Sequence, residues 1–365
     1  MRSSYTCESQ QAGLTLVELL VALVISLVLM GGVVQLFVAN KISYQLTEQV
    51  SAMQESARYA MWRLGRDIRM AGYTGCSGRD QEGVVINIGF PAASTFTPDN
   101  GIEGWEAAGT NYGSYATLAE TAVPADASVS GWTTGGSTTP VLDGTTNAVG
   151  TSDVIRLWHT DGDGVLVDVS GSTVKATGST PPYSAGDTMM LTDCTMVDIA
   201  AVCSVSGSDA SLAGTSCPNG PSPQFLNDGA AHAFKLAGWV YYVGKRGGLP
   251  SSPSSLFRRE IGVNGVAGVA QELVEGVEAL QLQYGIDTDV DPDGVADAYV
   301  NADQVPDWNH VVSVRVHLLM QSLRTDVVDG SQTFAFNGAT VISPSNSGRL
   351  RYPFVATISL RNRSR

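Results

Sequence analysis

The feature that most constrains this chain is an apolar run of 25 residues, Leu14–Val38, whose only charged member is Glu18. As an α-helix the run extends roughly 37 Å, which is long enough to cross a bilayer. A cleaved secretory signal places small residues directly after its apolar run. Here the run continues instead into a polar segment with helical spacing. The sequence therefore predicts a membrane-spanning helix over 14–38.

Glu18 is the unusual residue of this run. A carboxylate in hydrocarbon costs several kcal/mol unless it has a partner, so an acidic residue inside a membrane span indicates a function. A plain membrane tether leaves Glu18 unexplained. The alternative is that the side chain reaches toward the membrane interface and has no special role.

Apolar residues continue past the span at spacings of three and four, which predicts a one-sided helical stripe. We expect one helix over 14–71, apolar all round in its first half and amphipathic in its second, ending at Gly72. The members of the stripe are Ile42, Leu46, Val50, Met53, Ala57, Met61, Leu64 and Ile68.

Composition limits what the remaining residues, 72–365, can be. Acidic residues outnumber basic ones 35 to 21, for a net charge of −14, so a general nucleic-acid binder is excluded. Forty glycines indicate a loop-rich β domain, with irregular structure over 90–150. Several antiparallel strands laid over the amphipathic half-helix would make an α+β fold. The expected strands are Val154–Trp158, Val165–Val169, Lys235–Val243, Leu280–Tyr284, Val311–Leu319, Thr333–Phe336 and Arg349–Leu360.

The start of the apolar run resembles a type IV prepilin (class III) signal. The letters QAG at 11–13 precede LTLVE at 14–18 and then the unbroken run. The resemblance implies that a prepilin peptidase removes residues 1–13 by cutting after Gly13 and methylates the new amine of Leu14. Glu18 becomes the fifth mature residue. Two departures are Leu14, where Phe is usual, and a leader with only one basic residue.

Cleavage would give Glu18 a partner. The amine of Leu14 then lies within the membrane, where Glu18 of a neighbouring subunit can pair with it and offset the desolvation of both charges. Such a pair sets the register between packed apolar helices.

The C-terminal third resembles the PilW family of minor pilins. The resemblance rests on LVEGVEALQLQYGIDTD, WNHVVSVRVHLLMQS, TFAFNG, RLRYPFVATISLRNR and the earlier DIRMAGYTGC. It implies a pilin-like fold and a scarce subunit that helps to start pilus assembly at or near the tip. The implied partners are other minor pilins, the major pilin, the inner-membrane assembly platform and a tip-associated adhesin. The implied location is the inner membrane, with a periplasmic domain, and then the pilus at the cell surface.

Three other functions stay open at this point. A minor pseudopilin of type II secretion shares the N-terminal signal. A tip adhesin would need a binding surface, which Trp105 and Trp132 in the 90–150 region could supply if they are exposed; the alternative is that both rings anchor the loops. An anchored enzyme would need a catalytic constellation, but the four histidines are scattered and no nucleophile or phosphate-loop motif occurs, so we expect no catalysis.

The cysteines fit an exported domain. Cys7 falls in the leader, which leaves Cys76, Cys194, Cys203 and Cys217, an even set for an oxidising compartment. The short separation of Cys203 and Cys217 favours a local bridge, and Cys76 would then reach Cys194. Zinc is the competing interpretation, although no CxxC spacing supports it.

An acidic loop at 287–297 predicts a calcium site. Asp289, Asp291, Asp293 and Asp297 occupy positions 1, 3, 5 and 9 of a calcium loop, with Gly294 at position 6. Asp287 and the carbonyl group of Val295 would complete the ligands. Position 12 is Val300 and lacks the usual acid. The alternative is a solvated Asp/Gly turn, which we also prefer for Asp161, Asp163 and Asp168.

Overall fold

The computed structural model describes 15–73, 85–88, 101–115, 132–133, 142, 147–178, 180–194, 196–212, 231–248, 252–262 and 268–362. The chain comprises two compact units, residues 1–51 and residues 52–365.

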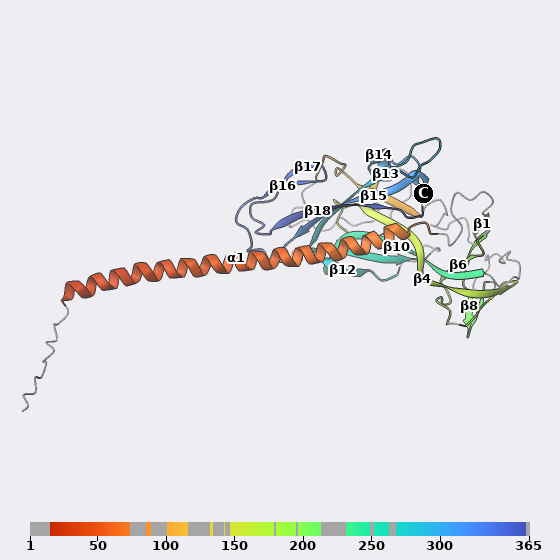
Figure 1. The fold of residues 1–365 in the computed structure, drawn as a ribbon, viewed down its shortest axis with the longest axis horizontal. Coiled ribbons are helices and arrows are strands. Elements are labelled where there is room, and N and C mark those ends of the chain that lie inside the picture. The colour runs from red at the N-terminus through yellow and green to blue at the C-terminus, as the bar shows by residue number, and fades with distance from the viewer. Residues whose placement is uncertain are drawn as a thin grey trace, which may run out of the picture. The chain divides into compact units, whose positions relative to one another are not determined.

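Helix α1, Leu16–Met70, confirms the helix expected over 14–71 (Figure 1). Its N-terminal stretch is long and apolar enough to cross a membrane, and the side chains of that stretch are exposed in the structure. Exposed apolar side chains over this length are those of a helix whose natural surroundings are lipid or other apolar helices.

The amphipathic stripe is confirmed for the part of α1 that belongs to the second unit. Met53, Ala57, Leu64 and Ile68 are buried, together with Ala60. The first members of the predicted stripe, Ile42 and Leu46, are exposed instead, and Met61 is half-buried.

The larger sheet has 12 strands and is built around the long antiparallel pair β4, Val154–Ser170, and β10, Ala231–Lys245. Its main path is β1-β7-β6-β10-β4-β5-β9-β8; β11 pairs with β10 and β12, and β2 pairs with β4 and β3. Among the described strands of this sheet, the β1–β7 pairing is parallel and the others are antiparallel. The other strands are β1 Val85–Ile88, β2 Ile102–Ala107, β3 Trp132–Thr133, β5 Thr173–Ala176, β6 Thr188–Thr192, β7 Met196–Ala201, β8 Ser204–Ser206, β9 Asp209–Ser211, β11 Ser254–Ile261 and β12 Gln271–Glu275.

Strand β4 corrects one expectation. The segment containing Asp161, Asp163 and Asp168, expected as a turn, lies inside a continuous strand, because both halves of β4 pair with β10 and its last residues pair with β5. A register shift between Ala233 and Lys235 and the positive φ of Gly162 (80°) absorb the irregularity.

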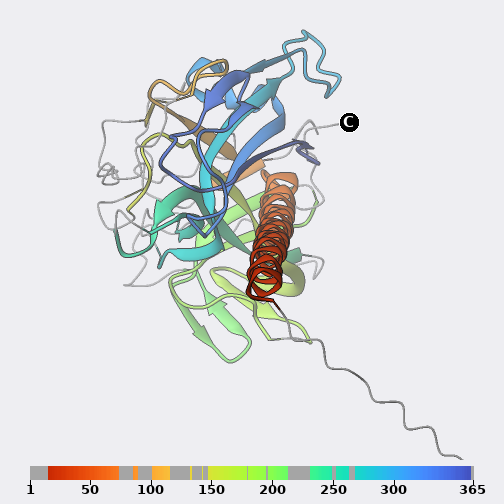
Figure 2. The same ribbon diagram turned by 90° about the vertical axis from the view of Figure 1, so that its left-hand side faces the viewer.

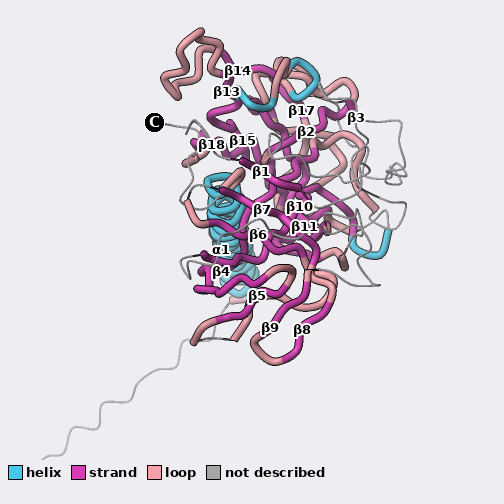
Figure 3. The backbone as a smooth tube through the Cα atoms, turned by 90° about the vertical axis from the view of Figure 1, so that its right-hand side faces the viewer, coloured by secondary structure: helices cyan, strands magenta, loops and turns pink. Residues whose placement is uncertain are grey.

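The second sheet has four antiparallel strands in the order β14-β13-β15-β18, and a separate hairpin is formed by β16 and β17. Short 3-10 turns lie at Arg246–Gly248, Ala302–Gln304 and Trp308–His310. The loop between β13 and β14 and the hairpin β8–β9 lie at opposite ends of the second unit (Figure 3). The strands are β13 Val277–Ile286, β14 Ala298–Val300, β15 Val311–Gln321, β16 Thr333–Phe336, β17 Ala339–Ile342 and β18 Arg351–Ser359.

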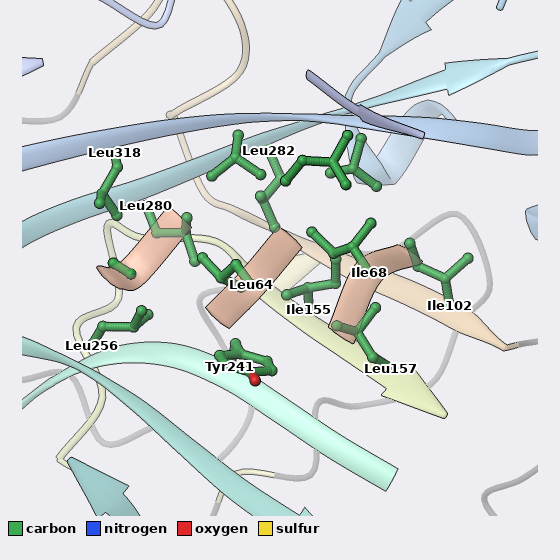
Figure 4. Packing of buried hydrophobic residues seen from close by; sticks show 14 of the residues in the cluster. Leu64, Ile68, Ile102, Ile155, Leu157, Tyr241, Leu256, Leu280, Leu282 and Leu318 are labelled. Atoms are coloured by element: carbon green, nitrogen blue, oxygen red, sulfur yellow. The ribbon is translucent and has the colours of Figure 1, made fainter. Parts of the chain in front are cut away.

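One core joins α1 to both sheets, and strands of both lie next to the helix (Figure 2). Leu64 and Ile68 of α1 point into this core, where Leu157 comes from the larger sheet and Leu282 from the smaller one (Figure 4). An α-helix packed on antiparallel strands confirms the α+β class.

A two-residue clip also fastens the sheets to each other. The Ser152 Oγ atom accepts the amide of Leu280 (2.8 Å), and the Asp153 carboxylate accepts the amides of Ala107 (2.9 Å) and Leu282 (2.7 Å). Because these are buried backbone donors, each needs such an acceptor.

Of the two interpretations of Trp105 and Trp132, the exposed adhesive surface is wrong and the anchoring role is confirmed. Trp105 lies in β2, a strand buried along its whole length, and is fully buried; Trp132 is 8% exposed and donates its indole N–H to the carbonyl of Ser152 (2.8 Å). Both rings are core anchors, so neither supplies an adhesive surface.

Candidate functional site

The acidic loop 287–297 connects β13 to β14. Asp287 follows directly after β13 and is buried. Its carboxylate accepts the amides of Asp289 (3.2 Å) and Gly294 (2.8 Å). Gly294 has a positive φ of 78°, which a residue with a side chain rarely adopts. Asp287 therefore folds the loop back on itself.

This folding brings together three carboxylates, those of Asp287, Asp289 and Asp293, with one oxygen of each within 4.8 Å of the others. Negative charge accumulates there: the pKa of Asp289 is raised, chiefly by the charge of Asp297 and also by burial and by Asp287. Hard oxygen ligands in such a group are those that Ca²⁺ prefers.

The other predicted ligands take different places. Asp297 accepts the amide and the hydroxyl group of Thr288 (2.7 and 2.9 Å), which lower the pKa of Asp297. Asp291 lies outside the group of three, and Val295 donates its amide to Asp293 (2.8 Å). The structure thus assembles part of the predicted set.

The prepilin-like region shows a contact that the sequence reasoning missed. Glu18 accepts the amide and the hydroxyl group of Thr15 (3.1 and 3.0 Å), while its own amide donates to the Thr15 hydroxyl group (3.3 Å). This is a capping box, and the spacing Thr-x-x-Glu at a helix start is the signal that predicts it. Gly13 and Leu14 lie outside the described residues.

Two of the four expected cysteines can be placed. Cys194 and Cys203 are both disulfide-bonded. Cys76 and Cys217 lie outside the described residues, so the pairing of Cys203 with Cys217 and of Cys76 with Cys194 stays a prediction.

A buried charge in α1 was also missed. Asp67 is fully buried and accepts the hydroxyl group of Tyr241. Nitrogens of three cationic or titratable side chains surround it: Arg63 at 3.6 Å, His159 at 3.8 Å and Arg258 at 4.0 Å. Burial alone raises the pKa of Asp67, but the polar contacts with His159 and Tyr241 and the charge of Arg63 outweigh it, so the pKa is lowered.

Glu106 lies buried near Asp153, one of the two residues of the clip between the sheets. Burial, followed by the charge of Asp303, raises the pKa of Glu106 to about 7. Burial and the charge of Glu106 raise the pKa of Asp153 well above its usual value. Both shifts favour the protonated form of the carboxyl group.

Comparison with known proteins bears on the two ends of the chain. Residues 240–362, from within β10 to just beyond β18, match the PilW family, described as Type IV Pilus-assembly protein W. Residues 9–34 match the prokaryotic N-terminal methylation motif. Both resemblances found in the sequence are thereby confirmed. Searches of curated proteins and of solved structures gave no match.

Proposed function

Because the chain joins a methylation motif at 9–34 to a PilW region at 240–362, we propose that it is a minor pilin of a type IV pilus. The observation that carries this proposal is the continuity of α1. The helix starts directly after the cleavage motif, stays apolar for the thickness of a bilayer and then buries one face, which includes Met53, Leu64 and Ile68, in the core of the β domain.

The proposed role is structural. The protein waits in the inner membrane with its β domain in the periplasm, is cut and methylated by the prepilin peptidase, and enters the pilus through α1. Its partners are other minor pilins, the major pilin, the assembly platform and a tip-associated adhesin. We place it at or near the tip, where it helps to start assembly.

Glu18 supplies the proposed assembly contact. Its carboxylate already accepts two hydrogen bonds from Thr15 at the helix start. Cleavage gives every subunit a charged amine at Leu14. The Leu14 amine of a neighbouring subunit can then form an ion pair with this Glu18 carboxylate. An ion pair inside an apolar bundle fixes one register, because any other leaves both charges unpaired.

The function is tested by Glu18→Ala beside Gly13→Arg. Intact mass of membrane-extracted wild type should show a chain beginning at Leu14. Glu18→Ala should be cut at the same place yet be depleted about tenfold or more from sheared pili, the effect of losing roughly 1.4 kcal/mol of pairing. Gly13→Arg should keep its leader and be absent from pili.

Three outcomes contradict parts of the proposal. Wild-type protein that begins at Met1, or that is cut after the apolar run, would exclude prepilin processing. Normal amounts of Glu18→Ala in pili would show that the charge has no part in assembly. If deletion of the protein abolishes type II secretion and leaves pili unchanged, the protein is a pseudopilin instead.

We also propose that the loop 287–297 binds calcium. The converging carboxylates are those of Asp287, Asp289 and Asp293. Further oxygen ligands could come from the backbone carbonyl group of Val295 and from the carboxylates of Asp291 and Asp297. Because no acid stands at position 12, we expect a dissociation constant in the range of about 10⁻⁴ to 10⁻³ M, typical of extracellular modules.

Calcium binding should raise the melting temperature of the full chain in detergent. At tenfold excess over the dissociation constant the gain is about 1.4 kcal/mol. Asp289→Asn should abolish this gain by removing one ligand charge. The variant should keep the fold of the loop, because among the described residues no hydrogen bond involves the Asp289 carboxylate. The exposed Asp329→Asn is the matched control. Coincident melting curves in calcium and in chelator would identify a solvated turn.

A further inference from the structure

Strand β18 forms one edge of the four-stranded sheet, and among the residues that the structure describes its only partner strand is β15 (Figure 1). The amide of Leu360 donates to the carbonyl of Val312 (2.9 Å), which fixes the phase of the ladder. In an antiparallel pair, residues that hydrogen-bond to the partner strand alternate with residues whose N–H and C=O groups face away from it. Leu360 is bonded to β15, so Val355, Thr357 and Ser359 direct their backbone groups away from β15. Their N–H groups have no partner among the described residues.

The open part of the edge is short and well defined. At the start of β18, Arg351 donates its amide to the side chain of Gln332 (2.9 Å), and Pro353 has no N–H group. Beyond these, Val355, with 59% of its surface exposed, Thr357 and Ser359 are all exposed. Proline or charged residues usually protect an exposed edge strand from pairing with another strand. In β18 this protection does not extend to the last five residues, Val355–Ser359.

Two arginines stand at the C-terminal end of this edge. The amide of Arg361 donates to the carbonyl of Arg69 (3.2 Å). A Cβ atom on Gly65 would lie 3.4 Å from Nη1 of Arg69 and 3.6 Å from Cδ1 of Ile358, so the Arg69 guanidinium lies beside β18. Neither arginine forms an ion pair within the described residues, although the chain has 35 acidic residues.

We propose that the open edge of β18, with Arg69 and Arg361 at its end, docks an extended acidic segment of a partner protein as an additional antiparallel strand. A strand supplies the carbonyl and N–H groups that Val355–Ser359 lack, as in other β-strand additions. Since the added strand runs antiparallel, its carboxylates belong near its N-terminal end, opposite the arginines. A second copy of β18 fits less well, because Arg351–Ser359 contains no acidic residue.

The test uses the full chain in detergent micelles and a synthetic peptide, Asp-Glu-Thr-Val-Thr-Val-Thr, labelled for fluorescence anisotropy. We expect the peptide to bind, to protect the amides of Val355 and Ser359 from hydrogen exchange, and to lose affinity when its first two residues are lysines. Thr357→Pro should weaken binding about tenfold or more, because it removes an outward donor. Thr357→Val keeps the amide and should bind normally.

The charges are tested separately. Arg69→Gln and Arg361→Gln should each weaken binding of the acidic peptide about threefold or more. Arg58→Gln should not, since Arg58 is exposed on the same helix about 16 Å from Arg69. A peptide N-methylated on the amides that face β18 should fail on the unaltered protein, which keeps the test decisive even if Thr357→Pro does not fold.

Three results would overturn the proposal. These are equal binding of the acidic and the lysine peptides, no effect of N-methylation, and self-association of the protein through Thr357 in the absence of peptide, which would assign the edge to a second copy. The assay needs no pilus, so its failure leaves the proposed pilin function untouched.

Discussion

Replacing Asp67 with alanine should lower the free energy of unfolding of the β domain by about 3–5 kcal/mol, the usual cost of removing one partner from a buried ionic group. The variant leaves Arg258 and His159 facing a buried space without an anion, and it removes the acceptor of the Tyr241 hydroxyl group. Urea denaturation of the full chain in detergent, followed by near-ultraviolet circular dichroism, measures the loss.

A matched control comes from the same helix. Glu55 is exposed, so Glu55→Ala should change the free energy of unfolding by no more than about 0.5 kcal/mol. Equal values for the two variants would show that the contacts of Asp67 contribute nothing beyond its place in the helix.

The contribution of Glu106 to the free energy of unfolding should fall as the pH rises from about 4.5 to about 7 and should then level off. In this window the unfolded chain has released the proton of Glu106, whose usual pKa is 4.5, while the folded chain retains it until about 7. The folded state binds more protons, so raising the pH favours unfolding. One pKa unit corresponds to about 1.4 kcal/mol, which sets an upper limit of about 3 kcal/mol for this group.

Glu106→Gln should remove that part of the pH dependence and make the protein more stable than the wild type at pH 8. Denaturation at a series of pH values shows the difference. Glu55→Gln, on an exposed site, should follow the wild-type curve. An unchanged slope in Glu106→Gln would mean that Glu106 is ionised in the folded protein at all these pH values.

The sequence could predict the elements whose patterns are strong and local. The apolar run and the stripe through Met53, Ala57 and Leu64 predicted α1 to within two residues of Leu16–Met70, because helical spacing repeats over many turns. The β domain was harder. β2 lies in a region rich in Gly, Ser and Thr, and its burial comes from pairing with β4, more than 40 residues away along the chain. Local composition carries no record of such a contact.

The sites were predictable to different degrees. Alternation of Asp at 287–293 located the acidic loop, but the use of Asp297 by Thr288 depends on how the loop closes. Asp67 had a usable signal, since Ala60, Leu64, Asp67 and Ala71 follow helical spacing and a charge inside a buried stripe calls for partners. Those partners, on β4, β10 and β11, could not be named without the fold.

The way in which α1 ends determines how this domain resists mechanical load. Along Met53–Ile68 the helix is held by apolar side chains and by the contacts of Asp67 with Tyr241, His159 and Arg258. Beyond them the amide of Gly72 donates to the carbonyl of Trp158 (2.9 Å), and the carbonyl of Arg69 accepts from Arg361 (3.2 Å). A pull on α1 is therefore resisted by these two hydrogen bonds as well as by the contacts of Asp67 with the strands. Because forced unfolding is governed by a rate, we expect the lifetime of this attachment under tension to depend on how fast these contacts break rather than on the equilibrium stability of the sheets.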